Sequence, residues 1–178
     1  ASPAVERLTQ RLNPKIAAYR SAAIETLKPT DRDLQHGLEL HADAVVFDSY
    51  GFSPRGAVDG DAIKSAIEAG ASSAEIDDLR EDAGMTRYVT NAVEQQEYRD
   101  AWRASGVTCI FQNAGEEGQD PLRLLKRLAR FTYVTDLMRG FVSKAVTPGD
   151  ILQAKKENYG YTGRIPGYWA WSGNCIDS

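Results

Sequence analysis

Two short runs of consecutive apolar residues, each followed by a polar segment, constrain the fold of this chain most strongly. The runs are Ala44–Phe47 and Val107–Phe111. Runs of this kind are typical of strands that are buried on both faces of a parallel sheet. Further strands are predicted at Phe141–Val146 and at Arg164–Trp171, and helical patterns separate these segments. Strands that alternate with helices predict an α/β fold with a parallel sheet or barrel.

Helices are predicted where apolar residues recur at spacings of three and four. One such face lies near the N-terminus and another follows Pro121; their residues are Val5, Leu8, Leu12, Ile16 and Tyr19, then Leu122, Leu125, Leu128, Phe131, Val134 and Leu137. Pro14 interrupts the first pattern, so we expect a kink or two shorter helices there. Capping residues predict several helix starts and ends, namely Thr30, Ser72 with Glu75, Asn91 with Glu94, Gly84 and Gly106.

The length limits how much of a barrel the chain can build. A complete (β/α) barrel takes about 250 residues, whereas this chain has 178. We expect a single α/β domain over residues 1–178, with a helical N-terminal extension at residues 1–41. Residues 42–178 are predicted to form a partial or truncated TIM-type barrel with inserted helices. A fragment of a longer protein and a different open α/β arrangement also fit this pattern.

Charge and hydropathy exclude some classes of partner. The net charge of −4 gives no electrostatic footprint for DNA or RNA. No apolar run approaches the roughly 18 residues that span a bilayer, so no membrane span is predicted. The compartment stays open between cytoplasm and periplasm. The helix after Pro121 carries a basic stripe, for which a solvated face is favoured over contact with an anion: Arg123, Lys126, Arg127 and Arg130.

The order of several short motifs resembles that of a known family. The motifs are Val45–Phe52, Gly84–Thr90, Gly106–Glu117, Val146–Lys155 and Trp171–Ser178. Together they resemble the N-terminal portion of a zinc-dependent membrane (renal) dipeptidase, in a divergent branch of bacterial type. The resemblance extends from about residue 38 to the end of the sequence. It implies a TIM-type barrel and the hydrolysis of dipeptides or small amides at a binuclear zinc site.

The same resemblance places aromatic residues where the family has zinc ligands. Tyr50 stands at the position of the family's histidine, and Phe52 stands at that of its first aspartate. Anchoring on the C-terminal motif puts Trp171 at the position of the bridging glutamate, and the later histidines would lie beyond Ser178. Zinc needs imidazole, thiolate or carboxylate ligands. No metal ligand and no cofactor is therefore predicted in this chain, although the family uses zinc.

Polar residues at the ends of the predicted strands are further candidates for a ligand pocket. Asp48 ends the first strand, and Gln112 and Asn113 end the second. Glu116 and Glu117 follow in the same loop, where a carboxylate pair could bind a cation or act in acid–base chemistry. The alternatives are a structural role for Asp48, which would bond the nearby backbone, and a solvated loop for the two glutamates. No catalytic residue is assigned.

Aromatic residues are concentrated near the C-terminus, at Tyr159, Tyr161, Tyr168, Trp169 and Trp171. They could line an apolar ligand cavity together with Tyr50 and Phe52. The favoured alternative is that they fill the core or cover a face of the sheet, because aromatic side chains bury large areas.

Two functions follow as hypotheses. The first is a divergent dipeptidase-family protein whose hydrolytic chemistry is altered or lost. The second is a non-catalytic module for small-molecule binding or assembly, derived from the same fold. An incomplete barrel leaves unpaired strand edges, which proteins cover or pair. The expected partner is therefore the remainder of a longer chain or a second copy of this one.

Overall fold

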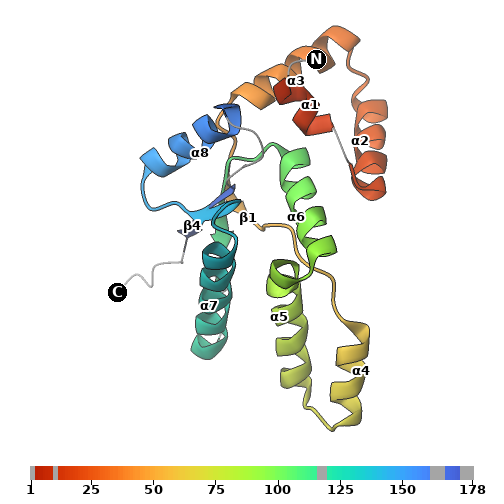
Figure 1. Cartoon of the computed structure of the whole chain (residues 1–178). Coiled ribbons are helices and arrows are strands. Elements are labelled where there is room, and N and C mark those ends of the chain that lie inside the picture. Colours follow the sequence, from red (N-terminus) through yellow and green to blue (C-terminus); the bar gives the residue numbers. More distant parts are fainter. Residues whose placement is uncertain (1–2, 10–11, 116–119, 161–166, 173–178) are drawn as a thin grey trace.

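The computed structural model describes residues 3–9, 12–115, 120–160 and 167–172. Helices surround one sheet of parallel strands (Figure 1). In chain order the elements are α1 (Pro3–Thr9), α2 (Pro14–Leu27), α3 (Asp31–Asp43), β1 (Phe47–Gly51), α4 (Gly60–Glu68), α5 (Ser73–Thr90), α6 (Ala92–Ser105), β2 (Cys109–Asn113), α7 (Pro121–Leu137), β3 (Val142–Lys144), α8 (Pro148–Gly160) and β4 (Gly167–Ser172). The predicted α/β character and parallel sheet are confirmed.

The strands lie in the order β1-β2-β4-β3, and every neighbouring pair is parallel. Cys109 at the start of β2 pairs with Phe47 of β1 on one side and with Tyr168 of β4 on the other. In a (β/α) barrel each strand lies beside the next one in the chain. Here β4 lies between β2 and β3, so the described residues form an open arrangement and show no TIM-type barrel.

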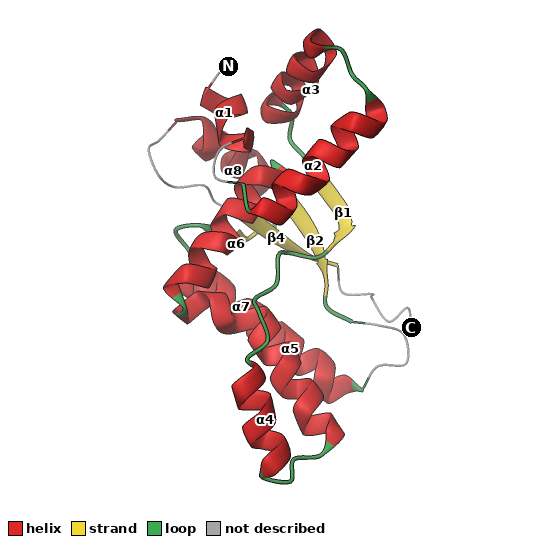
Figure 2. Ribbon diagram, turned by 90° about the vertical axis from the view of Figure 1, so that its right-hand side faces the viewer, coloured by secondary structure: helices red, strands yellow, loops and turns green. Residues whose placement is uncertain are grey.

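Each face of β2 has its own apolar cluster. Ile110 belongs to the larger cluster, half of whose buried members come from α5, α6 and α7, among them Tyr88, Trp102 and Phe131. Cys109 points to the opposite face, where it packs with Ala145 and with partly buried residues of β2 and α8. Figure 2 shows α6 and α7 crossing close to the strands while α4 extends away from them. The core therefore lies between β2 and the helices α5–α7.

The first predicted strand is displaced and less buried than expected. Strand β1 begins at Phe47, where the apolar run ends, and Val45 and Phe47 are 42% and 39% exposed. The run before it is held by Val46, whose carbonyl oxygen accepts from the Thr108 amide at 2.8 Å. The prediction of burial on both faces was wrong: β1 pairs with β2 alone, and none of its residues belongs to the apolar clusters that cover the two faces of β2.

Most predicted helix starts are confirmed. Pro14 is the first residue of α2, so the N-terminal pattern is divided into separate helices. Ser72 and Glu75 form a reciprocal capping box at the start of α5. Asn91 caps α6 with its side chain, but Glu94 binds Arg87 at 2.7 Å instead of the backbone of Asn91.

Of the two predicted helix ends, one is confirmed and the other is wrong. Gly106 ends α6 in the left-handed conformation, with φ of 64°, as its capping role requires. Gly84 was predicted to end a helix, and this prediction was wrong. Helix α5 continues past it to Thr90, and Gly84 is buried inside the helix. Its lack of a side chain serves packing rather than a turn.

The two predicted apolar helix faces are only partly buried. Phe131 and Val134 of α7 are buried, whereas Leu122, Leu125 and Leu137 are exposed. In the N-terminal pattern Val5 and Leu8 are buried, whereas neither α2 nor α3 buries any residue. In the described parts of the chain no helix is both long enough and apolar enough to cross a membrane.

Candidate functional site

A cavity of about 210 Å³ opens at the carboxyl ends of β1 and β2. The loop after β1 supplies one wall, α5 supplies another, and α7 and the end of β2 close the remaining sides. In that order the lining residues are Phe52, Ser53, Pro54 and Arg55, then Glu81, Gly84, Met85 and Tyr88, then Arg127 and Phe131 with Gln112 and Asn113. The carboxyl ends of parallel strands are where α/β proteins generally bind ligands.

Two backbone contacts fix the loop after β1 against the rest of the site. The Ser53 amide donates to the side-chain oxygen of Gln112 at 2.7 Å, in a buried position. Directly after Arg55, the Gly56 amide donates to the carbonyl oxygen of Gly84 at 2.8 Å. The loop is therefore tied both to the end of β2 and to the middle of α5.

Gly84 explains how Arg55 lies across α5. A Cβ atom on this glycine would stand 3.0 Å from a terminal nitrogen of Arg55 and 3.1 Å from its Nε. Glycine in the interior of a helix is less favourable than alanine by about 1 kcal/mol. The absence of a side chain at this position allows the Arg55 guanidinium to lie close to the backbone of α5.

The charges at the cavity are unbalanced. Glu81 is the carboxylate among the described lining residues, and it is surrounded by arginines. It lies 3.2 Å from Arg123, 2.7 Å from Arg127 and 3.0 Å from Arg130. Arg55 has no ion-pair partner within the described residues. The cavity thus carries a positive charge in a chain whose net charge is −4.

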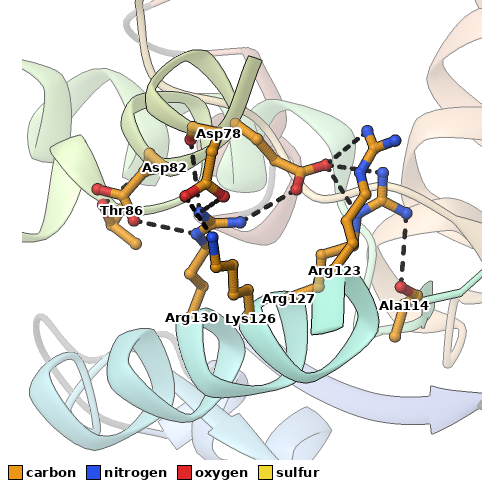
Figure 3. Close-up of polar contacts among 9 residues, drawn as sticks. Asp78, Asp82, Thr86, Ala114, Arg123, Lys126, Arg127 and Arg130 are labelled. Atoms are coloured by element: carbon orange, nitrogen blue, oxygen red, sulfur yellow. Dashed lines mark hydrogen bonds and ion pairs between the residues drawn. The ribbon is translucent and has the colours of Figure 1, made fainter. Parts of the chain in front are cut away.

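The arginines around Glu81 belong to an ion-pair network between α5 and α7 (Figure 3). Arg130 lies at its centre, 2.7 Å from Asp78 and 3.0 Å from both Glu81 and Asp82. Lys126 also binds Asp78, at 2.7 Å. The side chains of Arg130 and Glu81 are each only 8% exposed. The prediction of a solvated basic stripe was therefore wrong for Arg127 and Arg130, whereas Arg123 and Lys126 are exposed.

Two carboxylates of the network, Glu81 and Asp78, have a lowered pKa. Burial acts to raise the pKa of Glu81, but hydrogen bonds from Arg127 and Arg123 outweigh it and the net direction is down. Hydrogen bonds from Lys126 and Arg130 lower the pKa of Asp78. Both groups are therefore negatively charged at neutral pH, and the network holds α5 and α7 in the positions that form two walls of the cavity.

The inner wall of the cavity is aromatic. Tyr88 is 1% exposed, and its ring stacks on that of Tyr98 with the centroids 4.0 Å apart and the planes within 7°. Burial raises the pKa of Tyr88, although hydrogen bonding with Tyr98 and Ser53 and the charge of Arg55 oppose this rise. The phenol is therefore neutral and can donate a hydrogen bond near neutral pH.

Three of the residues predicted from the sequence line the cavity: Phe52, Gln112 and Asn113. Tyr50 lies next to it and accepts a hydrogen bond from the amide nitrogen of Asn113 at 2.8 Å. The rings of Tyr50 and Phe52 meet edge to face at 6.4 Å, and both side chains are 64% exposed. The end of β1 and the end of β2 are thus brought together as expected.

The other predicted residues are not shown at the cavity. Asp48 accepts from the Tyr50 amide at 3.1 Å and packs where a side chain on Gly51 would stand. Asp48 therefore has the structural role that was the alternative to a place in the ligand pocket. Trp171 is the β4 residue in register with Gln112, but its side chain lies outside the described part of the structure. Glu116 and Glu117 lie outside the described residues, as do the side chains of the C-terminal aromatic cluster.

The sequence reading missed Arg55 and the contributions of α5. One signal could have revealed the contact between α5 and α7. Asp78, Glu81 and Asp82 are spaced by three and four residues, which matches the spacing of the basic residues on α7. Opposite charges with the same helical period on two helices favour pairing of those helices. No comparable sequence pattern points to Arg55.

Among the residues that the structure describes, no group of three or more His, Cys, Asp or Glu side chains could hold a metal ion. At the positions that the resemblance gives to zinc ligands, Tyr50 is bonded to Asn113 and Phe52 offers no lone pair. No family model matches the chain, and no match is found among curated proteins or solved structures. The dipeptidase resemblance therefore remains a prediction from sequence.

Proposed function

We propose that this chain is a binding module for a small organic anion, held in the cavity at the carboxyl ends of β1 and β2. The observation that carries the proposal is the Arg55 guanidinium, which lines the cavity without a carboxylate partner in the described residues. A guanidinium binds carboxylate and phosphate groups through paired hydrogen bonds. An anionic group on the ligand would complete the charge balance of the site.

The size and walls of the cavity support a ligand of a few heavy atoms. Its volume of about 210 Å³ lies below the roughly 300–1,000 Å³ typical of sites for drug-sized ligands. Phe52, Met85 and Phe131 provide apolar surface beside Arg55. This combination suits a short carbon chain that ends in a charged group.

Descent from a membrane dipeptidase-type barrel remains a second proposal, which concerns ancestry. It rests on the order of the sequence motifs and implies zinc-dependent hydrolysis only if ligands are supplied by other residues. The cavity itself favours binding over hydrolysis, because Glu81 is engaged by arginines and is poorly placed to act as a general base. We therefore derive no catalytic step for this chain.

The affinity for valerate and for its uncharged amide, valeramide, tests the proposal. We expect valerate to bind about tenfold more tightly, because hydrogen bonds to a charged group contribute about 1.5–3 kcal/mol and Arg55 is partly screened by solvent. Calorimetric or ligand-observed NMR titrations measure both dissociation constants. Raising the salt concentration should weaken valerate binding and leave valeramide binding unchanged.

Substitution of Arg55 identifies the anchor. We expect Arg55→Gln to remove the preference for valerate. Arg80→Gln is the matched control, because Arg80 lies on α5 in an exposed pair with Asp77 and does not line the cavity. Equal affinity for valerate and valeramide in the unaltered protein, or an undiminished preference in Arg55→Gln, would contradict the proposal.

A further inference from the structure

Two exposed aromatic rings stand together at the cavity, one near the end of β1 and one in the loop that follows. Phe52 lines the cavity, and Tyr50 and Phe52 are each 64% exposed. Single apolar side chains on a protein surface are common, but a cluster of them beside a ligand cavity marks a binding surface. The packing of the core does not account for this pair.

Polar contacts with the end of β2 hold both rings in place. The phenol oxygen of Tyr50 accepts from the side-chain nitrogen of Asn113 at 2.8 Å. Phe52 directly precedes Ser53, whose amide donates to Gln112 at 2.7 Å in a buried position. Binding to groups that are already fixed costs less conformational entropy than binding to mobile ones. The pair is therefore a prepared contact surface.

The two rings form a corner. Their centroids are 6.4 Å apart and their planes meet at 77°. Aromatic rings attract one another in offset-stacked and edge-to-face arrangements, with centroids roughly 4.5–7 Å apart. A flat ring that stacks on one of the two is nearly perpendicular to the other, so it makes both kinds of contact at once. The corner therefore favours an aromatic ring over other apolar groups.

Phe52 and Arg55 lie close enough for one small ligand to reach both. Both line the cavity, and they are three residues apart on the loop after β1. Three residues of extended chain span at most about 11 Å. The cavity, with a volume of about 210 Å³, holds a few heavy atoms. A larger ligand must therefore extend out of it, where the exposed rings are available.

We propose that the ligand carries an aromatic ring besides its charged group, and that this ring packs into the corner between Tyr50 and Phe52. The ligand class is then a small aryl-substituted acid, in which a few carbon atoms join the ring to the anionic group. Arg55 binds the charge, and the cavity holds the carbon atoms between the two groups. This inference rests on the proposed function of the cavity.

Two probes of equal length test the ring itself. 5-Phenylvalerate and 5-cyclohexylvalerate have the same carboxylate and the same carbon skeleton, but only the first has an aromatic ring. The saturated ring has the larger apolar surface, so burial alone favours the cyclohexyl compound. We expect the unaltered protein to bind 5-phenylvalerate about twofold to tenfold more tightly, which is the range for an aromatic pair. Calorimetric titrations measure both dissociation constants.

Substitution of the two rings locates the contact. Phe52→Leu keeps an apolar side chain but removes the ring, so the preference for 5-phenylvalerate should fall to about one. Tyr50→Leu removes the other side of the corner and should also lower the preference. Tyr19→Leu is the matched control, because Tyr19 is 76% exposed on α2 and is not among the described residues that line the cavity. Surface substitutions of this kind change stability little, so we expect all three variants to fold.

The possible outcomes separate this inference from the proposal beneath it. If valerate and both ring-bearing acids fail to bind, or if Arg55→Gln leaves the binding of all three unchanged, the proposed function fails. If valerate binding depends on Arg55 but 5-phenylvalerate binds no more tightly than 5-cyclohexylvalerate, the proposed function stands and the inference is overturned. A preference that persists in both Phe52→Leu and Tyr50→Leu also overturns the assignment of the ring to this corner.

Discussion

Helix α5 buries residues along much of its length and α7 buries side chains in its C-terminal half, whereas α2 and α3 bury none. The difference does not lie in the capping of the helices, because α2, α3, α5 and α7 all begin with a side-chain cap. It lies in whether a partner faces the helix. Helix α5 has α6 and α7 beside it and carries acidic residues that match the basic residues of α7.

Polar contacts at a few points attach α2 and α3 to the rest of the chain. Arg20 of α2 donates to the carbonyl oxygen of Leu8 at 2.9 Å, and His41 of α3 contacts that of Ser105 at 2.8 Å. Lys155 of α8 donates to the carbonyl oxygen of Ala42 at 2.6 Å. Most helical stability in proteins comes from packing of a buried face. We therefore expect the region that forms the cavity to unfold only when the whole protein unfolds. Helices α2 and α3 are expected to unfold locally, while the rest of the protein stays folded.

The largest expected effect comes from removing the carboxylate at the centre of the α5–α7 contact. Glu81→Ala leaves the guanidinium groups of Arg127 and Arg130 buried without this partner. Breaking a buried pair in this way costs about 3–5 kcal/mol. Urea unfolding at neutral pH measures the change in the free energy of unfolding.

The matched control for this substitution is Glu39→Ala in α3. Glu39 is exposed and accepts one hydrogen bond, from Gln35 at 2.7 Å. Its loss should change the free energy of unfolding by about 0.5 kcal/mol or less, as for most surface positions. Similar effects of Glu81→Ala and Glu39→Ala would remove the distinction between the two regions.

This contrast also explains which parts of the structure could be predicted. Helix boundaries at Pro14 and Ser72 follow from local chemistry, and the sequence alone indicates them. Strand burial and strand order depend on neighbours that are distant in the chain, so the exposure of Phe47 was missed. Periodicity shows which side chains share a face but not whether a partner covers that face.

The same reasoning applies to the candidate site. Gln112 and Asn113 were found because they end a recognisable strand, and parallel strands end at one edge of the sheet. Arg55 was missed because its position depends on a loop tied to Gly84 in the middle of α5. That contact joins segments with no shared pattern, and nothing in the local sequence reveals it.

Acidification should weaken the cavity region next most strongly. The pKa values of Asp78 and Glu81 are lower in the folded protein than in the unfolded chain. Their contribution is therefore fully present above the unfolded pKa, near 4, and is lost as the pH falls through the lower folded values. The thermal unfolding midpoint, measured from neutral pH downward, should drop in this acidic range. If the thermal unfolding midpoint of Glu81→Gln dropped by the same amount over this pH range, Glu81 would not be a source of the acid sensitivity.

Matched cap substitutions give the smallest effects and compare the two regions directly. Ser72→Ala removes the capping box of α5 and Thr30→Ala removes the corresponding cap of α3. Loss of a cap costs about 1 kcal/mol. In α5 we expect this loss in the global free energy of unfolding. In α3 we expect faster hydrogen exchange of its own amides and little global change. Equal global losses would show that α3 unfolds together with the core.

An NMR titration of the isotope-labelled chain with valerate tests the central claim most directly, because backbone amide shifts locate a bound ligand. We predict saturable shifts at Ser53, Arg55, Gly56 and Gly84, with the amides of α2 and α3 unaffected. The same titration of Arg55→Gln should give weak shifts without saturation. Absence of saturable shifts around the cavity, or saturable shifts confined to α2 and α3, would contradict the assignment of this cavity as an anion-binding site.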